Sequence, residues 1–255
     1  MFKSIFTIAR FTFYEAVRNH LFILAVIGLI CFFGLTEFVG ELAITESRQL
    51  QATLIGSGLR VFAVLTVSLF VIASMVREFN DKGFESLLSL PMPRHNYFFG
   101  KLAGFLLLGL TVSVLTGGLL LVYCEAHVVM IWTISLFCEL ALVIAMSVFC
   151  LLTFNNITLA YVVVIAFYFL SRTMSAIQLI SGSPILQSGE PSQAFMQFMI
   201  NVIAYVLPDM HGFTQGRWLA YGAEWGVLVP VLGQSAVYLS LLVSAGLFDL
   251  YRKEL

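Results

Sequence analysis

Long apolar runs dominate this sequence, and they restrict what the chain can fold into more than any other feature. A helix needs about 20 consecutive apolar residues to cross the core of a bilayer. Six runs of about this length can be drawn, at residues 21–39, 56–76, 98–123, 128–152, 157–175 and 227–249. Lipid offers no partners for backbone N–H and C=O groups, so such runs form helices. The sequence therefore predicts an all-α integral membrane protein with six transmembrane helices in a single domain spanning residues 1–255.

The composition agrees with a membrane protein and argues against several other classes. Of the 255 residues, 60% are hydrophobic and 11% are charged, whereas a soluble domain carries about a quarter charged residues. A net charge of −1 gives no indication of a nucleic-acid partner. The four cysteines form no C-x-x-C pair and no zinc-binding spacing, which favours a packing role for them. No metal site and no cofactor bound by this chain are expected.

The distribution of Lys and Arg predicts the orientation of the spans, because cytoplasmic connections carry the excess of positive charge. With both termini in the cytoplasm, nine basic residues lie inside and four lie outside. The inner set is Lys3, Arg10, Arg18, Arg77, Lys82, Arg94, Lys101, Arg252 and Lys253, and the outer set is Arg48, Arg60, Arg172 and Arg217. We therefore expect a multi-pass protein with both termini in the cytoplasm.

The first 20 residues have the pattern of an amphipathic helix. Lys3, Thr7, Arg10, Tyr14 and Arg18 recur at spacings of three or four, with apolar side chains between them. A basic amphipathic helix ahead of a span is typical of a helix that lies in the membrane interface. The alternative is a simple positively charged flank that sets the orientation of the first span.

Two connections are predicted on the outer side of the membrane. Residues 36–55 carry several charges and are expected to form a short solvated helix or loop. Residues 176–226 begin with Gly, Pro and Ser clusters that are typical of loops. They continue with an apolar stretch of about 15 residues that stops at Pro208 and is too short to cross alone. This stretch is predicted to be a re-entrant or interfacial helix, since an extra span would place the C-terminus outside.

The most polar long segment, residues 80–101, lies between the second and third apolar runs. Asp81 is a candidate N-cap and Pro91 a stop signal for a short helix. Between them Phe84, Leu87 and Leu88 share one face, which predicts a helix on the cytoplasmic surface. This helix could pack onto the protein's own spans or onto lipid headgroups, or it could bind a soluble partner.

The same segment resembles the first cytoplasmic loop of permeases of the ABC-2 type. The matching residues, in order, are Arg77, Glu78, Glu85, Leu87, Leu88, Pro91, Arg94, Gly100 and Lys101. The chain differs from the family pattern at Lys82–Gly83, where the family has Gly-Thr, and at Pro93, where Ser is usual. The six predicted spans and the amphipathic N-terminus extend the resemblance to the layout of the whole chain.

The resemblance implies that this loop is the coupling helix of an ATP-binding-cassette transporter. The residues implied to contact the ATPase subunit are Glu78, Asp81, Gly83, Phe84, Glu85, Leu87, Leu88, Pro91 and Arg94. The chain has no G-x-x-x-x-G-K-[ST] phosphate loop, so ATP and Mg²⁺ are expected on a separate ATPase chain and this chain is not expected to be an enzyme. A bacterial cytoplasmic (inner) membrane, a second permease copy, identical or different, and accessory subunits are also implied. The resemblance also implies export, which is typical of the family, but the sequence does not identify the cargo.

Glu139 is the most unusual residue of the apolar runs. It lies about 11 residues from the outer end of its run, or roughly 16 Å deep at 1.5 Å per residue. A carboxylate at that depth costs several kcal/mol unless it is protonated, paired or hydrated. Glu139 is therefore a candidate for the substrate path, or else a structural acid, with Arg60 and Arg172 as candidate charge partners. A membrane enzyme or a channel is the alternative function, although no catalytic motif or filter repeat accompanies Glu139.

Residues 100–104, GKLAG, form a G-x-x-x-G motif in apolar surroundings. Glycines at this spacing allow two helices to approach closely. The sequence leaves open whether the second helix belongs to the same chain or to another copy.

Overall fold

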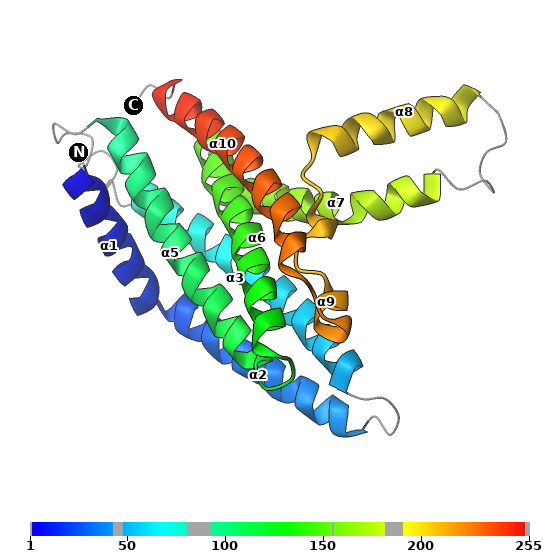
Figure 1. Ribbon diagram of the computed structural model, residues 1–255. Helices are drawn as coiled ribbons and strands as arrows, with labels where there is room; N and C mark the ends of the chain where they lie inside the picture. The colour runs from blue at the N-terminus through cyan, green and yellow to red at the C-terminus, as the bar shows by residue number, and fades with distance from the viewer. Residues whose placement is uncertain (1, 43–47, 81–92, 155, 182–190, 253–255) are drawn as a thin grey trace.

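The described part of the chain consists of helices joined by short turns and loops (Figure 1). The computed structural model describes residues 2–42, 48–80, 93–154, 156–181 and 191–252, and no strand occurs within these ranges. The helices are α1 (Phe2–Arg18), α2 (His20–Leu42), α3 (Arg48–Asn80), α5 (Arg94–Leu120), α6 (Ala126–Thr153), α7 (Ile157–Ser181), α8 (Pro191–Val206), α9 (Gly216–Tyr221) and α10 (Leu228–Arg252). Two short 3₁₀ turns, η1 (Met210–Gly212) and η2 (Trp225–Val227), flank α9.

Five helices are long and apolar enough to cross a membrane. They cover Gln51–Glu78, Arg94–Leu120, Ala126–Thr153, Ile157–Ser181 and Trp225–Arg252. The apolar part of α2 at Phe22–Leu35 meets the same criterion only together with α1, from which it is bent by 60°. These findings confirm an all-helical chain with several candidate spans, as expected of a multi-pass membrane protein.

The predicted connection at residues 36–55 is mostly made of the ends of two long helices. Helix α2 continues to Leu42 and α3 already begins at Arg48, and only residues 43–47 lie outside the described part. Ala52 and Ile55 are buried, because the first turns of α3 pack against α9. Tertiary packing thus extends the helix beyond the purely apolar run. Similarly, α7 continues past residue 175 to Ser181.

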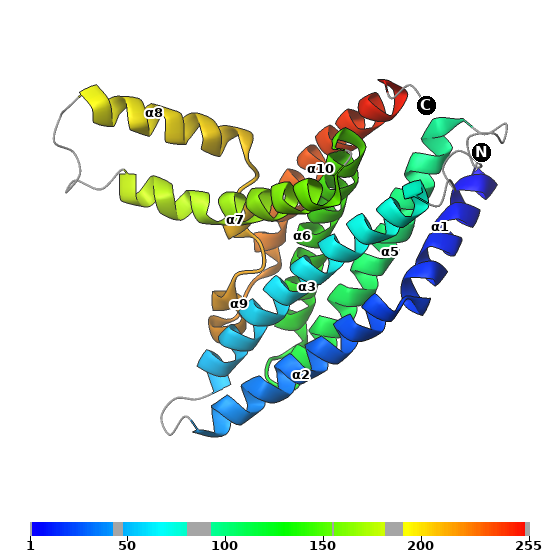
Figure 2. The same ribbon diagram turned by 180° about the vertical axis from the view of Figure 1, so that it is seen from behind.

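Helix α6 lies at the centre of the bundle. It contacts α3, α5, α7, α9 and α10. Of the residues in its most apolar 18-residue stretch, 78% are buried, whereas the corresponding share is 28% in α7 and 17% in α10. Both chain termini lie at one end of the bundle, which we call the terminal end (Figures 1 and 2). Helices α7 and α8 pack together as a hairpin that projects from the side of the bundle.

Helix α1 has the two faces that its sequence pattern predicts. The five residues of its polar stripe, Lys3, Thr7, Arg10, Tyr14 and Arg18, are all exposed, whereas Ala9, Thr12 and Ala16 are buried. Phe6 and Phe11 are also exposed, at 69% and 70%. Basic and aromatic side chains together on an exposed face are typical of a helix at a membrane interface.

Candidate functional site

Glu139 lies in the middle of α6 and is fully buried. Its oxygen Oε1 accepts a hydrogen bond of 2.8 Å from the Tyr168 hydroxyl and one of 3.2 Å from Nη1 of Arg172. Its other oxygen, Oε2, accepts a hydrogen bond from the Thr214 hydroxyl. The carboxylate therefore joins α6 to α7 and to the segment that precedes α9. Three hydrogen bonds, one of them from a guanidinium, compensate for the loss of water around this group.

Two arginines hold the segment Met210–Thr214, which we call the Met210–Thr214 loop. Arg172 donates to the carbonyls of Met210 and Phe213 at 2.8 and 3.3 Å, in addition to its ion pair with Glu139. Arg60, from α3, donates to the Thr214 carbonyl at 2.8 Å. Arg60 thus binds the loop through one backbone carbonyl. Arg172 binds it through two carbonyls and, among the described residues, is the one of these two arginines with a carboxylate within 4.0 Å.

Thr214 is the most constrained residue of this loop. Its φ of 40° is in the left-handed region, which non-glycine residues rarely adopt. Its backbone N–H donates to the Ser135 hydroxyl at 2.9 Å, and its side chain and carbonyl are bonded to Glu139 and Arg60. Such a conformation persists only where its neighbours fix it, so the network holds the loop in one conformation against α6.

Three residues that the sequence singled out separately lie in this one network: Glu139, Arg60 and Arg172. Sequence reasoning missed Tyr168, Thr214 and Ser135. Tyr168 could have been found, because it precedes Arg172 by four residues and so shares its face of α7. Thr214 carried no such signal, since it lies in a short loop 75 residues from Glu139.

A second group of charges lies where α1, α3 and α5 meet. Lys101 of α5 is only 6% exposed, and its Nζ lies 2.5 Å from Oε2 of Glu78 on α3 and 3.9 Å from Oε2 of Glu15 on α1. Ser74 of α3 donates to Oε1 of Glu15 at 3.4 Å. One buried ammonium group is thus shared by two carboxylates from two other helices. We call Glu15, Ser74, Glu78 and Lys101 the three-helix cluster.

The G-x-x-x-G motif allows α1 to reach α5 next to this cluster. A Cβ added at Gly100 would lie 2.7 Å from Cβ of Ile8, and one added at Gly104 would lie 2.6 Å from Cβ of Thr12. The Gly104 Cβ would also lie 2.9 Å from the backbone oxygen of Ala9. In this structure the motif therefore serves helix packing within the chain.

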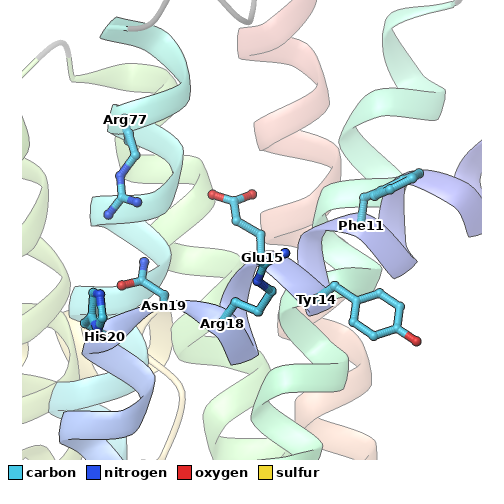
Figure 3. A pocket seen from close by; sticks show the side chains of 7 residues that line it. All are labelled: Phe11, Tyr14, Glu15, Arg18, Asn19, His20 and Arg77. Carbon is cyan, nitrogen blue, oxygen red and sulfur yellow. The ribbon is translucent and has the colours of Figure 1, made fainter.

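A pocket of about 590 Å³ opens where α1 turns into α2 (Figure 3). Its lining residues are Phe11, Tyr14, Glu15, Arg18, Asn19, His20 and Arg77. Figure 3 shows the Arg77 side chain extending from α3 toward Asn19 and His20 at the bend. The pocket shares Glu15 with the three-helix cluster, so the bend and the cluster form one continuous polar region.

Of the nine residues implied to dock onto an ATPase, two are described. Glu78 belongs to the three-helix cluster, and Arg94 opens α5 and donates to the Leu250 carbonyl of α10 at 3.5 Å. The other seven, Asp81, Gly83, Phe84, Glu85, Leu87, Leu88 and Pro91, lie outside the described residues. The predicted coupling helix therefore stays a prediction.

Among the described residues, no three His, Cys, Asp or Glu side chains form a group that could hold a metal ion. No protein-family model matches this chain, and no curated protein matches it at a significant level.

Proposed function

We propose that this chain is the membrane permease subunit of an ATP-binding-cassette transporter of the ABC-2 type. The contact between Glu78 and Lys101 carries the proposal. These two residues belong to two parts of the motif that resembles the ABC-2 type loop, Arg77–Glu78 and Gly100–Lys101. The two parts are separated by 21 residues in the sequence. In the fold they form a buried ion pair of 2.5 Å. Gly100, which precedes Lys101 in the motif, lies in close contact with Ile8 of α1.

This arrangement suits the transmission of a mechanical signal. Residues 81–92 join the end of α3, at Asn80, to the start of α5, at Arg94. The three-helix cluster ties α3 and α5 to each other and to α1 close to those ends. A movement that an ATPase imposes on residues 81–92 would therefore displace α1, α3 and α5 together. ATP and Mg²⁺ would be bound by the ATPase, and the spans of this chain would form the path of the cargo.

Two further observations support the partners and the orientation of this proposal. Helices α7 and α10 leave most of their apolar surface uncovered within one chain, which suits contact with lipid and with a second permease copy. The termini share one end of the bundle (Figure 1), as the excess of Lys and Arg in the predicted cytoplasmic connections requires. We place both termini in the cytoplasm, in a bacterial inner membrane, and we propose export as the direction of transport.

Docking can be tested by co-purifying the chain with a candidate ATPase subunit. We expect Leu88→Asp and Glu85→Arg to abolish co-purification and the ATPase activity that depends on this chain, because the first puts a charge on the predicted apolar face and the second reverses a charge. Glu125→Arg is the matched control, since Glu125 is exposed and precedes α6 at the far end of α5. Binding and coupled ATPase activity that survive both variants would refute the docking assignment.

Signal transmission can be tested apart from docking with the double variant Glu78→Gln/Lys101→Met. Removing both charges strands neither partner, so thermal stability and ATPase binding should stay close to those of the wild type. Coupling between ATP hydrolysis and transport should be lost, because α1, α3 and α5 are no longer tied by charge. Full transport by this double variant would show that the ion pair serves folding alone.

A further inference from the structure

A second pocket lies beside the Glu139 network, between α3, α7 and the segment that leads into α9. Its volume is about 410 Å³, and its lining residues are Thr53, Ser57, Arg60, Arg172, His211, Gln215, Gly216 and Arg217. Three guanidinium groups and an imidazole thus converge on one space, and none of the lining residues is acidic. This pocket is separate from the three-helix cluster and plays no part in the proposed coupling to an ATPase.

The positive charge of this pocket is only partly neutralised by the protein. Among the described residues, Glu139 is the single carboxylate within 4.0 Å of Arg60, Arg172 or Arg217. Three guanidinium groups thus share one paired carboxylate, and the carboxylate of Asp209 accepts a hydrogen bond from the backbone N–H of the lining residue His211. Arginines that lie close together attract an anion, because their mutual repulsion is relieved when it binds.

Arg60 has an unused hydrogen-bond donor here. Arg60 is 8% exposed, and its Nη1 donates a hydrogen bond to the Thr214 carbonyl. Its Nε is buried and has no hydrogen-bond partner among the described residues. A buried donor that stays unpaired costs about 1–3 kcal/mol.

The side chains of the pocket and its position favour an oxyanion with several oxygens. Guanidinium groups present planar pairs of donors that match phosphate oxygens, and such bonds are stronger than those between neutral groups. Thr53 and Ser57 lie in the first two turns of the candidate span Gln51–Glu78. The phosphates of membrane lipids occupy the interfacial layer just outside the hydrocarbon core, at the level where such a span begins.

We propose that this oxyanion pocket binds a phosphate group, with Arg60, Arg172 and Arg217 as its cationic ligands. The phosphate has two candidate sources with the same chemistry. One is the phosphodiester of a lipid headgroup in the surrounding leaflet, and the other is a free phosphate or a phosphorylated solute. The proposal does not depend on coupling to an ATPase.

The full-length protein, purified in a maltoside detergent, provides the test. Inorganic phosphate and short-chain phosphatidylglycerol are titrated separately while Tm is measured, with chloride at matched ionic strength and the corresponding diacylglycerol as blanks. We expect a saturable rise in Tm of at least about 2–4 °C over the blanks. A rise with phosphate alone identifies a soluble ligand, and a rise with the phospholipid alone or at lower concentration identifies a lipid headgroup.

The variants Arg217→Gln and Arg60→Lys show whether the rise comes from this pocket. Arg217 is exposed and has no hydrogen-bond role in the network around Glu139, so Arg217→Gln should fold normally and lose most of the rise. Arg60→Lys keeps the positive charge but replaces the planar guanidinium with a single ammonium group, and it should weaken the ligand's effect. Arg252→Gln, an exposed arginine on α10, is the matched control and should behave as the wild type. The proposal is overturned if neither ligand raises Tm above the blanks, or if the rise persists undiminished in both pocket variants.

Discussion

Glu139→Gln should lower the free energy of unfolding by about 3–5 kcal/mol, because the substitution strands Arg172 in the interior. Glutamine keeps the size of the side chain and one acceptor oxygen, but it loses the negative charge and replaces the other oxygen with an NH2 donor. Arg172 would remain 16% exposed, beside Arg60 and with carbonyl oxygens as its only acceptors from the Met210–Thr214 loop. Thermal or denaturant unfolding of the purified protein in detergent measures the effect.

The reverse substitution, Arg172→Gln, should cost less than Glu139→Gln. A stranded carboxyl group can take up a proton and become neutral, whereas arginine stays charged in proteins. Combining the two substitutions should restore part of the stability, since the uncompensated charge at position 172 is then removed. Glu125→Gln, which alters a side chain that is 82% exposed, is the control and should be nearly neutral.

These measurements also decide the role of Glu139. Full burial and three hydrogen bonds favour a structural acid that fixes the Met210–Thr214 loop against α6. A Glu139→Gln protein with wild-type stability but altered transport would contradict this interpretation and assign the residue to the cargo path.

Gly104→Ala should destabilise the contact between α1 and α5 by about 1–3 kcal/mol, the usual cost of overpacking. The new methyl group would lie 2.6 Å from Cβ of Thr12 and 2.9 Å from the backbone oxygen of Ala9. Backbone atoms cannot move aside as a flexible side chain can, so α1 has to shift away from α5. The free energy of unfolding and the protease sensitivity of α1 report this change.

Gly118→Ala is the matched control on the same helix. No atom lies within 4 Å of a Cβ built at Gly118, and alanine is the better helix former by about 1 kcal/mol in a helix interior. Gly118→Ala should therefore leave stability unchanged or raise it slightly, whereas Gly104→Ala lowers it. Equal effects of the two substitutions would show that α1 is not held by close packing at Gly104.

The sequence by itself determined that this chain is helical and suited to a membrane. Apolar runs of about 20 residues allow no other secondary structure in lipid. Of the five helices that are long and apolar enough to cross a membrane, four contain a predicted span entirely and the fifth contains nearly all of one. The amphipathic pattern of residues 1–20 likewise fixed the exposed and buried faces of α1, because these follow from the 3.6-residue period alone.

The ends of the helices were less predictable. Residues 48–55 look like part of a polar connection, yet they form the first turns of α3 and bury Ala52 and Ile55 against other elements. Hydropathy shows how apolar a segment is, but it does not show whether a neighbouring element packs against the segment. Here α9 packs against α3. The resemblance to ABC-2 type permeases depends on a short motif. The central residues of that motif, 81–92, lie outside the described part of the chain.

Only the tertiary structure decided which groups meet. Local sequence marked Glu139 as costly and named two arginines, but it could not choose between them or supply Tyr168 and Thr214. The ion pair joins residues 33 positions apart, and the bond to Thr214 spans 75. The same holds for the G-x-x-x-G motif, whose close contact proves to be α1 of the same chain. Partners across such distances are set by how the helices pack, because a buried charge is satisfied by whatever groups the fold brings within hydrogen-bonding distance.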